Sequence, residues 1–260
     1  MDTISIFANL PEMPLDAWEA SKRTLNLYCQ IVGKVRLALH PRLNHWWHAP
    51  LYVSPRGLTT QAIPLQTGLI DLEFDLVEHM LVLRSTSGGK EVIKLEDGLS
   101  VASFYEAVMT SLDTLGVHVD ILAKPYDPDK VGSDIPFAED TTNASYDPEF
   151  VTRYWHILTW IDAVFREFKG KFCGKSTPVH LFWHSFDLAY TRFSGRAAPL
   201  DGGSNVDKEA YSHEVISFGF WPGDSSVPAP AFYSYTYPEP EGLRTMALGP
   251  SDATWVGDAS

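Results

Sequence analysis

The sequence predicts an α+β fold in which a mostly antiparallel sheet, arranged as a meander, packs with about three helices. Apolar residues recur at helical spacing in three segments, and several short runs of alternating apolar and polar residues follow one another between turn signals. Strict alternation of strands and helices is missing, which disfavours a doubly wound parallel sheet. Residues 1–242 are expected to form a single domain, and residues 243–260 a poorly packed C-terminal tail.

The first expected helix begins at Asp16, which has capping-box spacing to Glu19, and it ends at Gly33. Its apolar stripe includes Trp18 and Leu25, which lie seven residues apart. Two strands are expected after this helix, on either side of the segment NHWWH, at residues 34–39 and 49–54.

The meander comes next, because alternating or apolar runs are separated by turn signals. Four strands are expected here: Leu58–Leu65, Gly68–Asp75, Met80–Ser85 and Glu91–Leu95. Ser100 is the expected N-cap of a second helix over Val101–Leu115, which Gly116 ends. A strand over Val117–Leu122 is expected to close the first half of the chain.

The second half begins with residues 124–147, whose Pro, Asp, Ser and Thr content predicts a linker or a long ordered loop. Asp147 as N-cap and Pro148 in the first turn predict a third helix that runs to about Lys169. Three strands are expected beyond this helix: Pro178–Arg196, Val215–Trp221 and Ala231–Tyr237.

Composition limits the classes of partner and the compartment. The net charge of −13 disfavours nucleic acid and anionic membrane surfaces, because both are bound by basic residues. No basic leader and no run of about 20 apolar residues occurs, so a cytoplasmic protein that neither spans nor binds membranes is expected. Cys29 and Cys173 belong to no CxxC pair, and separate buried thiols are favoured over a disulfide.

The segment from Pro178 to Arg196 is the most informative part of the chain, because it carries two histidines, an aspartate and two arginines on an expected strand. Burying a neutral polar group without a partner costs about 2–7 kcal/mol, so these groups must be paired, hydrated or committed to a ligand. On one extended strand, His180 and His184 would lie about 13 Å apart on the same face, too far apart to share a metal ion.

Five segments give the chain a specific resemblance: NHWWHAPLYVSPRGLTT, PVHLFWHSFDLAYTRFSGR, EAYSHEV, GFWPG and AFYSYTYPEPEG. On these segments, from about Leu10 to Gly242, the chain resembles an uncharacterised bacterial and fungal family that is known only as a domain of unknown function. The resemblance implies one domain and implies no activity. His184 departs from the family pattern, which places a small residue there, so His180 is the better candidate for a functional group.

The expected site is a histidine and carboxylate cluster in an aromatic-lined pocket of a small-molecule enzyme of unknown reaction. His180 and His213, with Asp187 and Glu214, are the candidate catalytic groups, because histidine transfers protons near neutral pH. A divalent metal is the alternative, with the candidate ligands His45, His48, His180 and His213. For His45 and His48, the favoured interpretation is hydrogen bonding to the backbone, with Trp46 and Trp47 anchoring an edge of the core.

Arginines and tryptophans complete the expected site. Arg56, Arg192 and Arg196 would bind an acidic group of the substrate, and Trp47 and Trp183 would form the walls. A structural ion-pair network with Asp187 is the other interpretation of these arginines. Two further functions stay open: a non-catalytic binding protein for an apolar ligand with an acidic group, and a structural or partner-binding protein.

Overall fold

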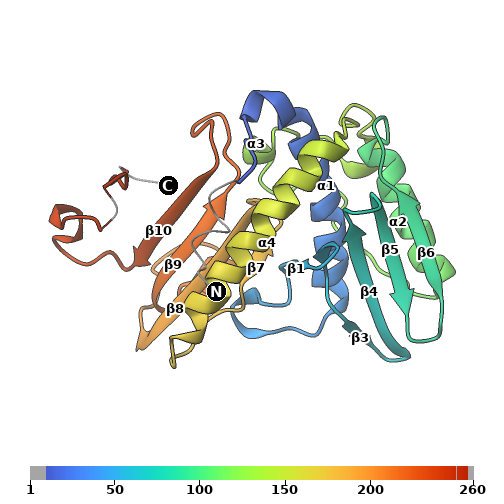
Figure 1. The fold of residues 1–260 in the computed structure, drawn as a ribbon. Coiled ribbons are helices and arrows are strands. Elements are labelled where there is room, and N and C mark those ends of the chain that lie inside the picture. The colour runs from blue at the N-terminus through green and yellow to red at the C-terminus, as the bar shows by residue number, and fades with distance from the viewer. Residues whose placement is uncertain (1–9, 250, 257–260) are drawn as a thin grey trace.

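The computed structural model describes residues 10–249 and 251–256 and confirms the α+β class. Three long helices, α1 (Leu15–Leu39), α2 (Val101–Thr114) and α4 (Pro148–Gly170), pack with two antiparallel sheets. The sheets lie on opposite sides of the molecule, with α1 between them and α4 across the second sheet (Figure 1). Residues 1–9 of the predicted domain, and residues 250 and 257–260 of the predicted tail, lie outside the described residues.

The first sheet is the predicted meander, with strand order β1-β2-β4-β5-β6 and with β3 also paired to β4. Its strands are β1 (Tyr52–Ser54), β2 (Gly57–Thr59), β3 (Ile63–Leu65), β4 (Gly68–Asp75), β5 (Met80–Ser85) and β6 (Lys90–Lys94). The single strand predicted over 58–65 is wrong, because the chain bends between β2 and β3. Gln61 adopts a φ of 55° at the bend, and the Thr60 hydroxyl accepts the N–H of Leu72 at 3.0 Å.

The second sheet has the order β10-β9-β8-β7 and contains β7 (His180–Phe182), β8 (Asp187–Ala197), β9 (His213–Trp221) and β10 (Ala231–Tyr237). The long strand predicted over 178–196 is therefore wrong, because the chain makes a hairpin. Phe186 has a φ of 59° in the turn, and its N–H donates to the carbonyl of Phe182 at 2.7 Å. His180 and His184 consequently lie on a strand and in a turn, not on one extended face.

Helix α1 also differs from the prediction, since it passes through Gly33 and ends at Leu39. The expected helix end at Gly33 and the expected strand over 34–39 are both wrong. Gly33 is needed for close packing, because a Cβ there would collide with three ring atoms of Trp183, the farthest at 2.6 Å. The glycine therefore marks a contact with the β7–β8 turn instead of a helix end.

Side-chain capping follows the sequence at two of the three long helices. Ser100 accepts the N–H of Ser103 at the start of α2, and Asp147 accepts the N–H groups of Glu149 and Phe150 at the start of α4. The capping box expected at Asp16 does not form, because α1 begins one residue earlier, after Pro14, without a side-chain cap. The strand expected over 117–122 is irregular backbone.

The core lies around α1, which is buried on nearly every side from Leu25 to Arg36. Helix α2 packs against α1 and β6, while α4 packs against α1, β1 and β8. Phe168 of α4 meets the rings of Tyr190 and Phe218 edge-on, so α4 covers one face of the second sheet. The bridge between Leu51 and Leu181 joins the segment before β1 to β7, and thereby connects the two sheets.

Short helical segments lie between the main elements: η3 (Asn44–Trp46), α3 (Pro128–Val131), η4 (Phe137–Glu139), α5 (Asn205–Ala210) and η5 (Leu243–Thr245). The segment 124–147 is ordered by its own polar groups, because the buried carboxylate of Asp140 accepts hydrogen bonds from Thr142 and Asn143. Among the described residues, no helix is both long enough and apolar enough to cross a membrane.

Candidate functional site

The four candidate histidines divide between separate surroundings. His45 and His213 lie near each other at one end of the second sheet, with ring centroids 6.1 Å apart. His48 stacks on the Trp46 ring, and His180 lies inside the protein beside Tyr52. No three His, Cys, Asp or Glu side chains are grouped to hold a metal ion in the part of the chain that the structure describes.

His45 is held in one orientation by the end of α5. The backbone carbonyl of Glu209 lies 2.9 Å from His45 Nδ1, and the Glu209 carboxylate accepts the backbone N–H of His45 at 3.1 Å. Because a carbonyl only accepts, Nδ1 carries the proton and Nε2 is the bare nitrogen. The backbone adopts left-handed φ angles at two consecutive residues, 55° at His45 and 59° at Trp46. Such conformations are costly for residues other than glycine and cluster at functional sites.

Lys175 is the direct partner of the bare nitrogen. Its Nζ lies 2.6 Å from His45 Nε2, and 5.6 and 5.0 Å from the ring centroids of Trp47 and Phe193. Burial and the neighbouring Lys175 ammonium lower the pKa of His45, so the imidazole is neutral at pH 7. Sequence reasoning did not identify Lys175, because nothing in its local pattern distinguishes it from any surface lysine.

His213 and Glu214 begin β9 and have different partners. His213 Nδ1 lies 3.1 Å from the Ser212 hydroxyl, and its ring faces His45 edge-on. Glu214 accepts a hydrogen bond from Ser194 at 2.7 Å and pairs with Arg196 at 3.1 Å. His213 therefore adds a second imidazole to the group around His45, while Glu214 is engaged in an exposed ion pair.

We call His45, Lys175 and His213, with the rings of Trp47 and Phe193, the His45 cluster. Its members come from η3 and the residue after it, from the segment before β7, from β8 and from the start of β9. Lys175 is exposed and His213 is half-buried, so the polar side of the cluster reaches solvent. Segments up to 168 residues apart in the chain, from His45 to His213, are thus brought together.

His48 and His180 lie outside this cluster. His48 is buried, accepts the N–H of Leu43 at 3.2 Å, and so has the backbone-bonded role considered above. Burial lowers its pKa. His180 is fully buried, and neither of its ring nitrogens has a hydrogen-bond partner among the described residues. Burial, and secondarily the charge of Arg36, lower the pKa of His180 to about 3.

Asp187 is also buried and lies on the face of the second sheet opposite α4. Its two carboxylate oxygens accept hydrogen bonds from the hydroxyls of Ser185 and Tyr233. The Tyr233 ring lies directly over Gly219, the residue opposite it on β9, where a Cβ would collide with the ring. Burial, and then the Asp187 carboxylate, raise the pKa of Tyr233 well above its ordinary value.

The three candidate arginines do not share a site with one another. Arg56 pairs with Asp75 at 2.5 Å on the first sheet. Arg192 donates to the carbonyl of Phe168 at 2.7 Å and stacks over its ring at 3.6 Å. Each of these contacts, like the pair between Arg196 and Glu214, holds local structure together.

The two candidate tryptophans are likewise separated. Trp47 belongs to the His45 cluster, where its ring lies 5.2 Å from the His45 ring. Trp183 is buried in the β7–β8 turn, where Nε1 donates to the carbonyl of Ala49 at 2.9 Å. Of these two tryptophans, Trp47 is the one that lies beside the polar groups of the His45 cluster.

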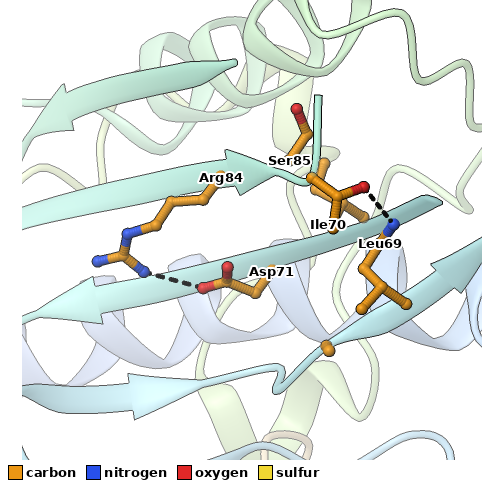
Figure 2. Close-up of a pocket in the computed structure, with 7 residues that line it drawn as sticks. Leu69, Ile70, Asp71, Arg84 and Ser85 are labelled. Carbon is orange, nitrogen blue, oxygen red and sulfur yellow. Dashed lines mark hydrogen bonds and ion pairs between the residues drawn. The ribbon is translucent and has the colours of Figure 1, made fainter. Parts of the chain in front are cut away.

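Two surface pockets occur elsewhere, on the first sheet and α2. One, of about 200 Å³, lies between β4 and β5 and is lined by Ala62, Leu69, Ile70, Asp71, Arg84, Ser85 and Thr86 (Figure 2). The Arg84 guanidinium forms ion pairs there with Asp71 at 2.9 Å and with Glu73 at 3.0 Å. The other, of about 380 Å³, is lined by residues of β6 and α2. Neither pocket contains a residue that the sequence singled out.

Comparison with known proteins yields one match. A family model described as a family of unknown function, DUF5996, matches residues 10–260, which extends beyond the region where the sequence motifs indicated a resemblance. No curated protein and no solved structure matches the chain.

Proposed function

We propose an activity for this chain, which belongs to the family of unknown function DUF5996, from the geometry of its His45 cluster. The proposal is an enzyme that acts on a small molecule by acid–base chemistry, with His45 as the general base. The observation that carries it is the bare Nε2 of a neutral, oriented imidazole, held 2.6 Å from the Lys175 ammonium.

The roles follow from the charges. His45 is oriented through Nδ1, so Nε2 takes a proton from a substrate that binds beside Lys175 and displaces its ammonium from Nε2. The ammonium of Lys175 then stabilises the negative charge that develops on the substrate. His213, with its ring 6.1 Å from that of His45, is placed to exchange protons with solvent or with the product. The rings of Trp47 and Phe193 provide an apolar wall.

A metal-free site is favoured over a divalent metal site. The Lys175 ammonium lies 2.6 Å from Nε2 of His45, at the position that a coordinated metal ion would have to occupy. The positive charge of Lys175 also opposes a bound cation. The cluster contains two imidazoles, and no group of three His, Cys, Asp or Glu side chains that could hold a metal ion occurs among the described residues.

Activity is tested by incubating the purified protein with an extract of soluble metabolites and following the depletion of each compound by mass spectrometry. Wild type is expected to consume at least one compound that His45→Gln leaves intact. The matched control is His118→Gln, since His118 is an exposed histidine that pairs with Asp113 at 2.8 Å. Equal consumption by wild type and His45→Gln would exclude His45 as the general base.

The electrostatic part of the proposal has its own measurement. Removing the charge in Lys175→Met should raise the pKa of His45, because Lys175 disfavours the imidazolium. Since the folded-state pKa of His45 lies below its unfolded value of about 6.5, protonation favours the unfolded chain. This residue's contribution to stability is therefore lost as pH falls below about 6.5. NMR titration of the His45 ring protons measures the pKa in wild type and in Lys175→Met. An unchanged pKa in the variant would contradict the pairing of His45 with Lys175.

A binding protein without turnover is the second candidate function. Lys175 forms no ion pair with a carboxylate of the described chain, and its ammonium lies against two aromatic rings. This arrangement suits an apolar ligand with an acidic group, whose acid would pair with Lys175. The same metabolite experiment separates the two functions, because a binding protein retains a compound through gel filtration without changing its mass.

A further inference from the structure

A buried cation without a counter-charge lies in α1. Arg36 is 2% exposed, and its only backbone partner given by the structure is the carbonyl of Thr60, reached through one terminal nitrogen. Among the described residues, Arg36 Nε has no hydrogen-bond partner and no carboxylate forms an ion pair with this side chain. Burial lowers the pKa of Arg36, while the charge interaction and hydrogen bonding with the neutral Tyr52 hydroxyl act in the opposite direction. The guanidinium nevertheless remains charged at neutral pH.

His180 is a second unsatisfied group in the same region. It is fully buried on β7, and both ring nitrogens lack hydrogen-bond partners in the part of the chain that the structure describes. Because burial and Arg36 hold its pKa near 3, the ring is neutral and offers one N–H donor. A buried polar group without a partner is rare in native proteins and calls for a specific explanation, such as a bound ion or water.

Tyr52 lies close to both groups. Its ring centroid is 5.4 Å from Arg36 Cζ and 6.3 Å from the centroid of the His180 ring. The bridge between Leu51 and Leu181 places β1 beside β7 and so fixes Tyr52 next to His180. Burial raises the pKa of Tyr52, so the phenol is neutral and cannot serve as the counter-charge of Arg36.

The charge of Arg36 distinguishes between water and an anion as the missing partner of Arg36 and His180. Water would satisfy the unpaired N–H groups but would leave the guanidinium charge uncompensated in an apolar interior, which is strongly unfavourable. An anion both accepts hydrogen bonds and neutralises the charge. The guanidinium carries a single positive charge, so a monovalent anion is sufficient to neutralise it.

We infer that Arg36, His180 and Tyr52 form a binding site for a small monovalent anion, a halide ion or a carboxylate group, enclosed between α1, β1 and β7. Arg36 Nε and the N–H of His180 donate to the anion. This site is built from other elements than the His45 cluster and does not depend on the function proposed for that cluster.

Bromide locates the anion directly in the unmodified protein. Crystals grown in sodium bromide should give an anomalous difference peak within hydrogen-bonding distance of both Arg36 Nε and a ring nitrogen of His180. Water at this position, an empty position, or peaks confined to the surface, which mean an adventitious ion only, would each overturn the inference. No variant has to fold for this measurement.

Thermal unfolding tests the same site in solution and separates halide from carboxylate. Bromide or formate, compared at constant ionic strength with the bulky anion HEPES, should raise the Tm of wild type in a saturable manner. The expected rise is about 5–10 °C at a 100-fold excess over the dissociation constant. Saturation by one anion and not the other identifies the ligand class.

Variants assign the effect to the site. Arg36→Met and His180→Phe should each abolish the anion-dependent rise in Tm, whereas Arg84→Met, which removes a surface arginine, should retain it. Equal anion dependence in wild type and both site variants would place the anion elsewhere and refute the inference.

Discussion

Replacing Gly33 with alanine tests how the two halves of the fold are joined. Gly33 lies inside α1, where the Trp183 ring from the β7–β8 turn packs directly on the helix backbone. Elsewhere in a helix this change would be favourable, because alanine has a helix propensity about 1 kcal/mol better than that of glycine. Here the new methyl group would overlap the ring, with its distance to Cγ only 2.6 Å.

The expected loss in the free energy of unfolding follows from the contacts that the Trp183 ring would lose. The ring is 5% exposed and has no room to retreat without distorting its neighbours, and overpacking of this kind costs about 1–3 kcal/mol. Movement of the ring also breaks the hydrogen bond from Nε1 to the carbonyl of Ala49, worth about 1 kcal/mol. After subtracting the propensity gain, Gly33→Ala should lower the free energy of unfolding by about 1–3 kcal/mol.

Urea unfolding followed by circular dichroism measures this change, and Tm should fall by about 2–4 °C for each kcal/mol. Gly170→Ala is the matched control, because Gly170 ends α4 and a Cβ there meets no atom within 4 Å. The control should not lose stability. In a Trp183→Ala background, Gly33→Ala should become neutral or stabilising, since the clash is gone. A Gly33→Ala protein as stable as wild type would refute the packing argument.

Two further predictions concern buried groups on the second sheet and on α1. Tyr233→Phe removes a donor from the buried Asp187 carboxylate and should cost about 1.5–3 kcal/mol in urea unfolding. Tyr235→Phe, at an exposed residue, should change stability by less than about 0.5 kcal/mol, and equal losses would argue against the role of Asp187. Ellman's reagent should modify only Cys173 in the native protein, because Cys29 is fully buried; rapid reaction of both thiols would contradict that burial.

Local sequence patterns were sufficient for the elements whose signals act over a few residues. Ser100 and Asp147 bond the N–H groups two or three residues ahead, so their helices begin where the sequence indicates. Alternation predicted the strand Ala231–Tyr237 with the bounds that the structure has. The class of fold follows from the same signals, because three helices and many short strands without strict alternation leave few arrangements.

Tertiary contacts decided what Gly33 and His180 do. A glycine ends a helix or admits a close neighbour, and only the position of Trp183 shows that the second applies. The alternation around His180 suggested one long strand, but the chain turns back at Phe186, which places His180 beside Tyr52.

The His45 cluster depends on tertiary structure for the same reason. Sequence composition identified His45, His213 and Trp47 as candidates, because imidazole and indole are suited to proton transfer and to apolar walls. Lys175 has no distinctive local pattern, and it gains its role only by lying 2.6 Å from a bare imidazole nitrogen. Hydrogen bonds and pKa shifts depend on distances between side chains, and the fold sets those distances between residues far apart in the chain.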